Sequence, residues 1–415
     1  MYKGSKDCLN RAFLLSMTTK KKTDPDALIL LHALKSHFDV RWWRAFESLL
    51  ALFLTVSVRT LLGNAQGCSS STLSRLLNLA PWKDKELWKA LNTWQTTRLR
   101  KFHAHRWGRK PTVRVRLDVL DKAAPHGPVR LTSLEKTGKK LPFVRVYNKV
   151  FGIHLVVLHV SVGDLSFPLG VRVYALENKE TPIALALDLL GKFPAWTWPE
   201  FRVCLLADSG FFSVDFLEQV RVLGYNHVSL GAKSNLTLRG GAKLSSARRG
   251  SKVWLESLAC TPLYVAWIDL PRKDGLKRFF VLSTMKGSVR TLLGRHAKRW
   301  LIESYFKSAQ YDFGLNETRL RTEDGIRRWI FVSFLAYSLS SLERALEGRK
   351  SQTQNPERWT LTLARAAQTV LETLLLEWRE RVRIPALLAE LYALGVPLCI
   401  LAHRVFIGSV HICKS

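Results

Sequence analysis

The stretch R-V-C-L-L-A-D-S-G, from Arg202 to Gly210, decides the fold class. Its first part is a continuous apolar run, which is typical of a strand buried on both faces of a parallel sheet. A turn is predicted at Ser209-Gly210, helical spacing follows at residues 213–223, and a second apolar run lies at residues 226–230. A strand, a helix and a strand in this order predict two parallel strands joined by a crossover helix.

The segments before this unit indicate antiparallel pairing. Residues 112–120 alternate between the two faces and are rich in β-branched side chains, so they predict a strand. Two longer strands are expected at residues 152–162 and 165–175, with the hairpin signal Gly163-Asp164 between them. A helix capped by threonine is expected from Thr181. The two halves together predict a mixed α/β fold, in which helices cover the faces of a mixed sheet.

Charge is the strongest compositional signal. Lys and Arg total 64 and Asp and Glu total 33, which gives a net charge of +31. Hydrophobic residues make up 47% of the chain, so it is expected to be globular and not disordered. A globular protein this basic most often acts on nucleic acid or on another anionic surface. We therefore expect a nucleic-acid partner, with a merely basic protein as the alternative.

Cysteine spacing and hydropathy argue against several other classes. No two of the six cysteines have the Cys-x-x-Cys spacing of a zinc ribbon or finger. Cys204 lies in the predicted buried strand, which suits a reduced thiol. The N-terminus has no secretory signal, and the most apolar stretch, residues 49–58, is shorter than the roughly 20 residues that span a bilayer. We expect a soluble protein of the cytoplasm.

The distribution of helical and strand patterns along the chain predicts five regions. Helical spacing prevails at both ends, and strand patterns with basic turns interrupt the core before its last helices. The regions are a helical N-terminal domain at 1–110, the first part of the core at 111–231, an all-β insertion at 232–285, the second part of the core at 286–346 and a helical region at 347–415.

One short helix of the N-terminal region is a candidate for DNA contact. Residues 67–78 place a glycine and several serines before a helix that carries Arg75. The pattern fits the second half of a helix-turn-helix and equally an ordinary capped helix of a bundle.

Three carboxylates are placed where a sheet could gather them into a metal site. Asp118 lies in the first predicted strand, Asp208 ends the buried strand, and Glu303 lies on a helix predicted at 289–309. The carboxyl ends of strands are where open α/β sheets place their sites. Mg²⁺ prefers oxygen ligands, and two such ions can support phosphodiester chemistry by activating one oxygen and stabilising another.

Each carboxylate also has an ordinary structural explanation. Asp118 could pair with Arg114 or Arg116 on a polar strand face, and Asp208 could form the turn that follows it. Glu303 could form surface ion pairs with residues four positions away on its own helix. Each residue alone is a weak signal, but their combination in a chain with this net charge favours the metal site.

Glu303 has an unusual place on its helix. At 3.6 residues per turn it shares a stripe with Trp300, Phe306 and Gln310, which puts a carboxylate between two aromatic side chains. We expect Trp300 and Phe306 to anchor the helix against the sheet, while Glu303 reaches the strand ends that carry the two aspartates.

At these residues the sequence resembles the DDE transposases of bacterial insertion sequences, in the branch called the insertion-sequence-4 type. The resemblance covers about residues 60–345 and rests on Leu117-Asp118, on residues 206–211, and on residues 299–306 followed by Gly314-Leu315. It implies a ribonuclease H-like core, a helical DNA-binding N-terminal region and a β insertion between the second Asp and the Glu. The separation of 95 positions from Asp208 to Glu303 leaves room for that insertion.

The resemblance also implies a mechanism and partners. Asp118, Asp208 and Glu303 would be catalytic and would hold two Mg²⁺ or Mn²⁺ ions. A strand would be cut at each transposon end, and the freed 3′ hydroxyl would attack target DNA. The implied partners are double-stranded DNA, as terminal inverted repeats and target, and a second copy of the chain in a homodimer. Two alternatives remain: an inactive or regulatory DNA-binding copy, and a ribonuclease H-like nuclease without strand transfer.

The helix signature of this family implies contacts to phosphates near the cleavage site. The family has Tyr, then Arg three residues on, Glu four after that, and Lys seven after the Glu. Arg299 and Glu303 match it, whereas His296 stands at the Tyr position and Gln310 at the Lys position. Lys307, one turn before Gln310, could supply the missing charge.

The implied β insertion offers two further DNA contacts. Family members stack a flipped base on a tryptophan of this region, and Trp254 and Trp267 lie in it. Stacking on an indole suits any base. For each of the two, packing in a core is the alternative.

Overall fold

The computed structural model describes most of the chain between residues 25 and 375. The described ranges are 25–55, 60–103, 110–119, 134–135, 142–147, 150–175, 180–272, 275–351, 363–372 and 374–375. They fall into two compact units, residues 30–368 and a smaller unit made of residues 1–29 and 369–415. In the smaller unit the described residues, 25–29, 369–372 and 374–375, are helical. Of the predicted C-terminal helical region, residues 352–362, 373 and 376–415 lie outside the described residues. The fold and the candidate site belong to the larger unit.

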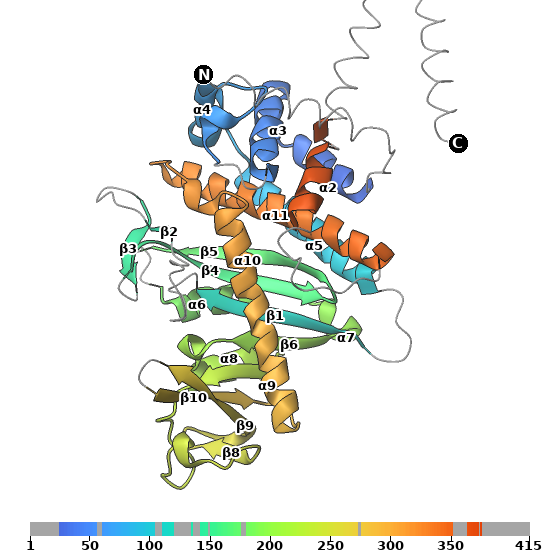
Figure 1. Cartoon of the computed structure of the whole chain (residues 1–415). Coiled ribbons are helices and arrows are strands. Elements are labelled where there is room, and N and C mark those ends of the chain that lie inside the picture. Colours follow the sequence, from blue (N-terminus) through green and yellow to red (C-terminus); the bar gives the residue numbers. More distant parts are fainter. Residues whose placement is uncertain are drawn as a thin grey trace, which may run out of the picture. The chain divides into compact units, whose positions relative to one another are not determined.

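The centre of the larger unit is a mixed sheet (Figure 1). Five strands run in the order β5-β4-β1-β6-β7. Antiparallel pairs join β5 to β4 and β4 to β1, whereas parallel pairs join β1 to β6 and β6 to β7. Their bounds are β1 Thr112–Val119, β4 Val150–Val162, β5 Leu165–Tyr174, β6 Arg202–Ala207 and β7 His227–Ala232. The predicted mixed α/β class, with the strand order of a ribonuclease H-like core, is confirmed.

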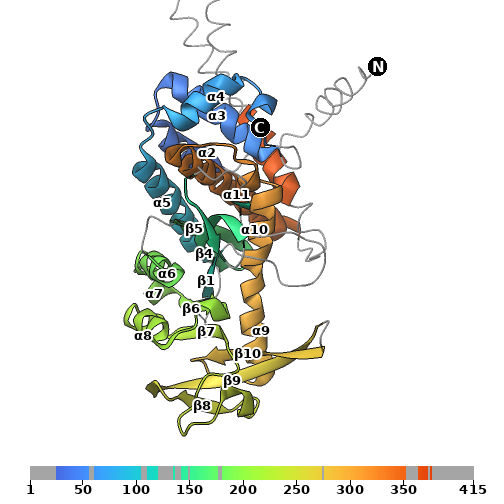
Figure 2. The ribbon, with the colours of Figure 1, turned by 90° about the vertical axis from the view of Figure 1, so that its left-hand side faces the viewer.

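Local sequence signals account for the connections between these strands. The hairpin between β4 and β5 turns at Gly163, as predicted. Helix α6 (Pro182–Gly191) begins where the Thr181 hydroxyl accepts a hydrogen bond of 3.2 Å from the amide of Ala184. Helix α8 (Val214–Val222) is capped by Ser213 and returns the chain from β6 to β7. With the short helix α7 (Thr197–Glu200), these helices cover one face of the sheet, and α9 and α10 lie on the other (Figure 2).

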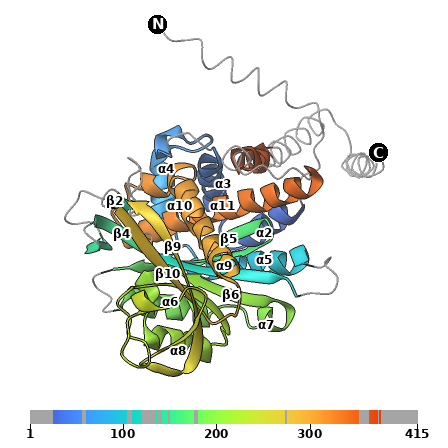
Figure 3. The same cartoon turned by 60° about the horizontal axis from the view of Figure 1, so that its bottom comes forward.

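The segment predicted as an all-β insertion continues the main sheet. It contains β8 (Lys252–Leu255), β9 (Leu258–Arg272) and β10 (Gly275–Ser283). Because β10 pairs antiparallel with β7, the sheet extends from β7 through β10 and β9 to β8 (Figure 2). Figure 3 shows β9 and β10 side by side. Two short strands, β2 (Leu134–Glu135) and β3 (Val144–Tyr147), pair with the beginning of β4.

Helices form the rest of the larger unit. Before the sheet come α2 (Pro25–Lys35), α3 (Val40–Leu54), the 3-10 turn η2 (Leu62–Asn64), α4 (Ser70–Asn78) and α5 (Asp84–His103). Helix α11 (Glu323–Ser351) packs against α3, α4, α5 and β5. It continues to Ser351, past residue 346, where the second part of the core was expected to end. None of the described helices is long and apolar enough to cross a membrane.

The predicted helix at residues 289–309 is present but interrupted. It consists of α9 (Val289–Ala297), the 3-10 turn η5 (Lys298–Trp300) and α10 (Leu301–Tyr311). A 3-10 turn has 3.0 residues per turn, whereas an α-helix has 3.6. The α-helical period is therefore broken at η5, and the faces of α9 and α10 are offset. This offset determines which side chains of the helix face the sheet.

Candidate active site

Two neighbouring parallel strands bring Asp118 and Asp208 to the same edge of the sheet. Leu117 on β1 is level with Ala207 on β6, and each aspartate follows directly in its strand. The charge of Asp208 contributes to the raised pKa of Asp118, which is consistent with their closeness. The side chain of Asp208 does not cap the turn Ser209–Phe211 that follows it. The turn-forming explanation of Asp208 is therefore not supported.

A glycine of the next strand makes room for Asp208. Gly231 lies on β7, one position beyond the pair of Ala207 with Leu230. A Cβ atom at Gly231 would stand 2.8 Å from the amide nitrogen of Ser209 and 3.2 Å from Oδ1 of Asp208. Both separations are closer than side chains normally allow, so the carboxylate of Asp208 lies against bare backbone.

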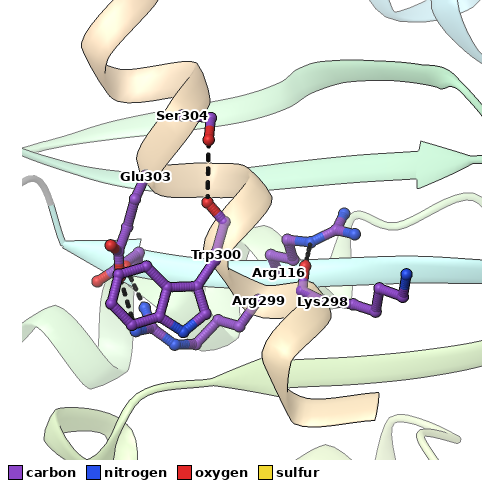
Figure 4. A network of polar contacts seen from close by, with 7 residues as sticks. Arg116, Lys298, Arg299, Trp300, Glu303 and Ser304 are labelled. Atoms are coloured by element: carbon purple, nitrogen blue, oxygen red, sulfur yellow. Dashed lines mark hydrogen bonds and ion pairs between the residues drawn. The ribbon is translucent and has the colours of Figure 1, made fainter. Parts of the chain in front are cut away.

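The helix brings Glu303 to the same edge through an arginine. Nη1 of Arg299 lies 2.8 Å from Oδ2 of Asp118, and Nη2 lies 2.7 Å from Oε1 of Glu303 (Figure 4). The Arg299 side chain is 9% exposed and that of Glu303 is 29% exposed. The expected i−4 ion pair of Glu303 exists, but the same guanidinium also binds a strand residue. Asp118 pairs with Arg299 and not with Arg114 or Arg116.

The electrostatics of this cluster are dominated by buried negative charge. Burial raises the pKa of Asp118 to about 8, and the charges of Asp208 and Glu303 add to the rise, while Arg299 opposes it. Burial lowers the pKa of Arg299, but the three carboxylates outweigh it, so its pKa is raised. One guanidinium thus faces three carboxylates, and the site favours further positive charge.

The carboxylate oxygens of the cluster are suitable ligands for a hard divalent cation, although in this structure two of the carboxylates pair with Arg299. Among the described residues, no three His, Cys, Asp or Glu side chains are placed so that they could hold a metal ion. Arg299 stands between Asp118 and Glu303 and acts as a stand-in cation, with its buried Nε lacking a hydrogen-bond partner. The three carboxylates offer the oxygen ligands that Mg²⁺ and Mn²⁺ take. A metal ion would require Arg299 to release at least one of them.

The other polar residues predicted on this helix lie in different environments. His296 is buried, with Nδ1 3.4 Å from the Ser229 hydroxyl, and burial together with Arg299 lowers its pKa to about 4. Gln310 is buried, and its Nε2 has no hydrogen-bond partner. Lys307 is exposed. Contacts of His296 and Gln310 with phosphate stay predictions that require both side chains to become accessible.

The expectation that Trp300 anchors the helix was wrong. Trp300 is 53% exposed, whereas Phe306 is buried as expected. The 3-10 turn that contains Trp300 shifts its side chain off the stripe, so Ile302 and Tyr305 face the core in its place. The Trp300 ring centroid lies 5.9 Å from the guanidinium of Arg299. An exposed aromatic ring therefore lies beside the ion cluster, a candidate DNA contact that helical spacing alone did not reveal.

The remaining predicted DNA contacts lie away from the cluster. The ring of Trp267 has the guanidinium of Arg278 3.7 Å from its centroid and that of Arg249 at 5.1 Å. The ring of Trp254 has Nζ of Lys252 at 4.7 Å. Both tryptophans are partly exposed.

Arg75 is exposed on α4, whose apolar side chains pack against α3 and α11. This packing is compatible with a bundle helix and with a helix-turn-helix. The DNA contact of Arg75 stays a prediction.

One family model matches about half of the chain. The family model described as "Transposase DDE domain" matches residues 132–339, a segment that includes Asp208 and Glu303 and begins after Asp118. Among solved structures, the chain is similar to the piggyBac transposase in its synaptic complex with hairpin DNA. That likeness has 11% identity and a TM-score of 0.46, and it covers 88% of this chain and 75% of the other. No curated protein sequence matches the chain.

Proposed function

Because the chain belongs to the family of transposase DDE domains, we propose that it cuts DNA strands at the ends of a mobile element and joins them to target DNA. One observation carries the proposal: Asp118 and Glu303, from a strand and a helix, both pair with the Arg299 guanidinium, and the charge of Asp208, at the end of the neighbouring strand, acts on the same group. The strands β8 to β10, between Asp208 and Glu303, support assignment to the insertion-sequence-4 type.

The three carboxylates are proposed to hold two Mg²⁺ or Mn²⁺ ions. Such ions supply activation of the attacking oxygen and stabilisation of the leaving oxygen in phosphodiester chemistry. The chain itself contributes position: β1 and β6 set the aspartates side by side, and Gly231 leaves the space in which the Asp208 carboxylate lies. Arg299 offsets part of the buried negative charge and, once released from a carboxylate, can bind a phosphate near the reacting bond.

Binding of DNA is proposed to use exposed basic and aromatic groups around this edge. A net charge of +31 favours association with any phosphate backbone. Trp300 beside the cluster and Trp267 on β9 are proposed to stack on bases. Two ends must be held together for transfer, so a homodimer is proposed as the working form.

The test is cleavage of a labelled element end in the presence of Mn²⁺. The wild-type chain is expected to nick the strand at the element boundary and, with target DNA present, to give a joined product. Asp208→Asn is expected to bind the same DNA with unchanged affinity and to leave it intact. The exposed Asp215→Asn on α8 is the matched control and should cleave normally.

The outcomes separate the alternatives. Binding without any nicking by the wild type would favour an inactive or regulatory copy. Nicking without a joined product would favour a nuclease. Normal cleavage by Asp208→Asn would contradict the proposed site.

A further inference from the structure

A second arginine, Arg116, is buried next to the ion cluster without belonging to it. It lies on β1 two residues before Asp118 and is 1% exposed. Its Nε donates a hydrogen bond of 2.6 Å to the carbonyl of Lys298 (Figure 4). Its Nη1 donates one of 2.9 Å to the Ser161 hydroxyl. Among the described residues, no carboxylate pairs with it. A buried guanidinium without a carboxylate is costly, and an apolar side chain would fill the space at lower cost.

The carbonyl of Lys298, which accepts the shorter of these bonds, lies where the helix is interrupted. Lys298 is the first residue of η5, the 3-10 turn that separates α9 from α10. It directly precedes Arg299, which binds both Asp118 and Glu303. Hydrogen bonds within a 3-10 turn have poorer geometry than those of an α-helix, so a charged donor from the sheet stabilises the turn.

The strand neighbour of Arg116 contacts the same helical segment about two turns further on. His159 on β4 is the direct cross-strand partner of Arg116. Its ring stacks on that of Tyr305 in α10, with centroids 5.3 Å apart and an angle of 29° between the planes. Lys298 and Tyr305 bracket Arg299 and Glu303 in the sequence. Two adjacent sheet residues thus contact the helix on either side of the two residues that enter the cluster.

We infer that Arg116 is a positioning residue, which with His159 fixes the rotation of the helix and thereby the places of Arg299 and Glu303. The inference rests on the proposed function. Arginine suits the role because its planar fork reaches the Lys298 carbonyl and the Ser161 hydroxyl together. A lysine carries its three donors on one freely rotating nitrogen and lacks the planar fork, so it holds the two acceptors in a less fixed geometry.

The test compares Arg116→Met and Arg116→Lys with Arg114→Met, which changes a partly exposed arginine two residues earlier on the same strand. Three quantities are measured in each protein: DNA affinity, the single-turnover cleavage rate on saturating DNA, and Mn²⁺ affinity by electron paramagnetic resonance without DNA. Arg116→Met is expected to slow cleavage about 10- to 100-fold and to weaken Mn²⁺ binding about tenfold. Its DNA affinity should stay within about twofold of the wild type, well below the ~10-fold change that a lost base contact gives.

Arg116→Lys should recover part of both losses, and Arg114→Met should show neither. Thermal unfolding checks that each variant is folded, and Arg116→Lys decides the matter if Arg116→Met does not fold. Folded Arg116 variants with wild-type Mn²⁺ affinity and cleavage would overturn the inference, as would an equal loss in Arg114→Met. Absence of cleavage in the wild type would instead count against the proposed function, and the Mn²⁺ measurement would still test Arg116.

Discussion

Charged side chains are buried at the strand ends that carry Asp118 and Asp208, whereas they are exposed on the outer strands β8 to β10. At the strand ends, Arg299 is 9% exposed and has two carboxylate partners at fixed distances. On the outer strands, Arg278 and Asp269 pair at 2.8 Å, but their side chains are 41% and 32% exposed. Arginines there lie over the ring of Trp267, which is itself partly exposed.

This difference in burial suggests that the two regions have different functions. Buried charges interact strongly and stay in one geometry, which phosphodiester chemistry requires, but their burial must be compensated. Exposed basic and aromatic groups interact weakly with one another and can re-pair with phosphates and bases. This contrast supports the proposal that the strand ends carry out the chemistry and that the outer strands bind DNA. Each prediction below changes one of the two regions.

The largest effect is expected from Glu303→Gln. It removes one negative charge from the cluster but keeps the size of the side chain, so cleavage should fall by about 10²-fold or more. DNA affinity should be unchanged, because Glu303 adds no positive charge to the surface. Single-turnover cleavage and a binding titration measure the two quantities. Glu218→Gln changes an exposed glutamate of α8; it is the control and should cleave at the wild-type rate.

A smaller loss is expected from Gly231→Ala. The added Cβ would meet the Ser209 amide and Oδ1 of Asp208, so the carboxylate must move. A shift of about 1 Å at a reacting centre can cost about 10²-fold in rate, so we expect a loss between about 10- and 100-fold. Gly210→Ala is the matched control, since a Cβ at Gly210 would meet no atom within 4 Å. Equal effects of the two substitutions would mean that the space at Gly231 is unimportant.

Mn²⁺ affinity should depend on pH through Asp118. Burial raises the pKa of this carboxyl to about 8, and a metal ligand must be deprotonated, so binding below that pH releases a proton. Affinity should therefore rise about tenfold per pH unit between pH 6 and 7.5 and level off above about 8. Calorimetry in two buffers of different ionisation enthalpy counts the released protons. Binding at pH 7 without proton release would contradict this assignment.

Trp300→Ala should weaken binding of the element end by about 1–3 kcal/mol if the ring stacks on a base. Tyr311→Ala on the same helix is the control, because Tyr311 is 55% exposed and lies at the far end of α10. A fluorescence anisotropy titration compares the variants. Equal losses would indicate a general effect of exposed aromatic residues and not a specific stack.

The smallest effect is expected on the outer strands. Arg249→Gln removes one exposed positive charge, so the slope of log affinity against log salt should fall by about 1 for any DNA sequence. The cleavage rate of bound DNA should not change. Lys192→Gln, on the opposite face of the sheet at the end of α6, is the control. A changed cleavage rate in Arg249→Gln would break the division between the two regions.

Sequence patterns were sufficient for the five central strands and their directions, but not for the short strands β2 and β3. Alternation and apolar runs report burial of each strand directly, and the end of β6 follows from the residues at 207–210. They did not predict that β10 would pair with β7, because pairing between distant strands depends on tertiary contacts. Trp300 was misplaced because a regular helix was assumed through a 3-10 turn.

The role of Arg116 was not predictable for a related reason. On the strand it is one of two arginines with the same alternation, and both were equal candidates for pairing with Asp118. Arg116 differs from Arg114 in its hydrogen bond to the carbonyl of Lys298. No pattern of side chains in a sequence predicts where a backbone carbonyl will lie.

The central claim is that Asp118, Asp208 and Glu303 form one metal site that Arg299 closes in the absence of metal. The most direct measurement is anomalous scattering from crystals of the protein soaked in Mn²⁺. The account predicts an anomalous peak between the carboxylates of Asp118 and Asp208, with the Arg299 guanidinium moved away from at least one carboxylate. Arg299 still bridging Asp118 and Glu303, with no Mn²⁺ beside the aspartates, would contradict it.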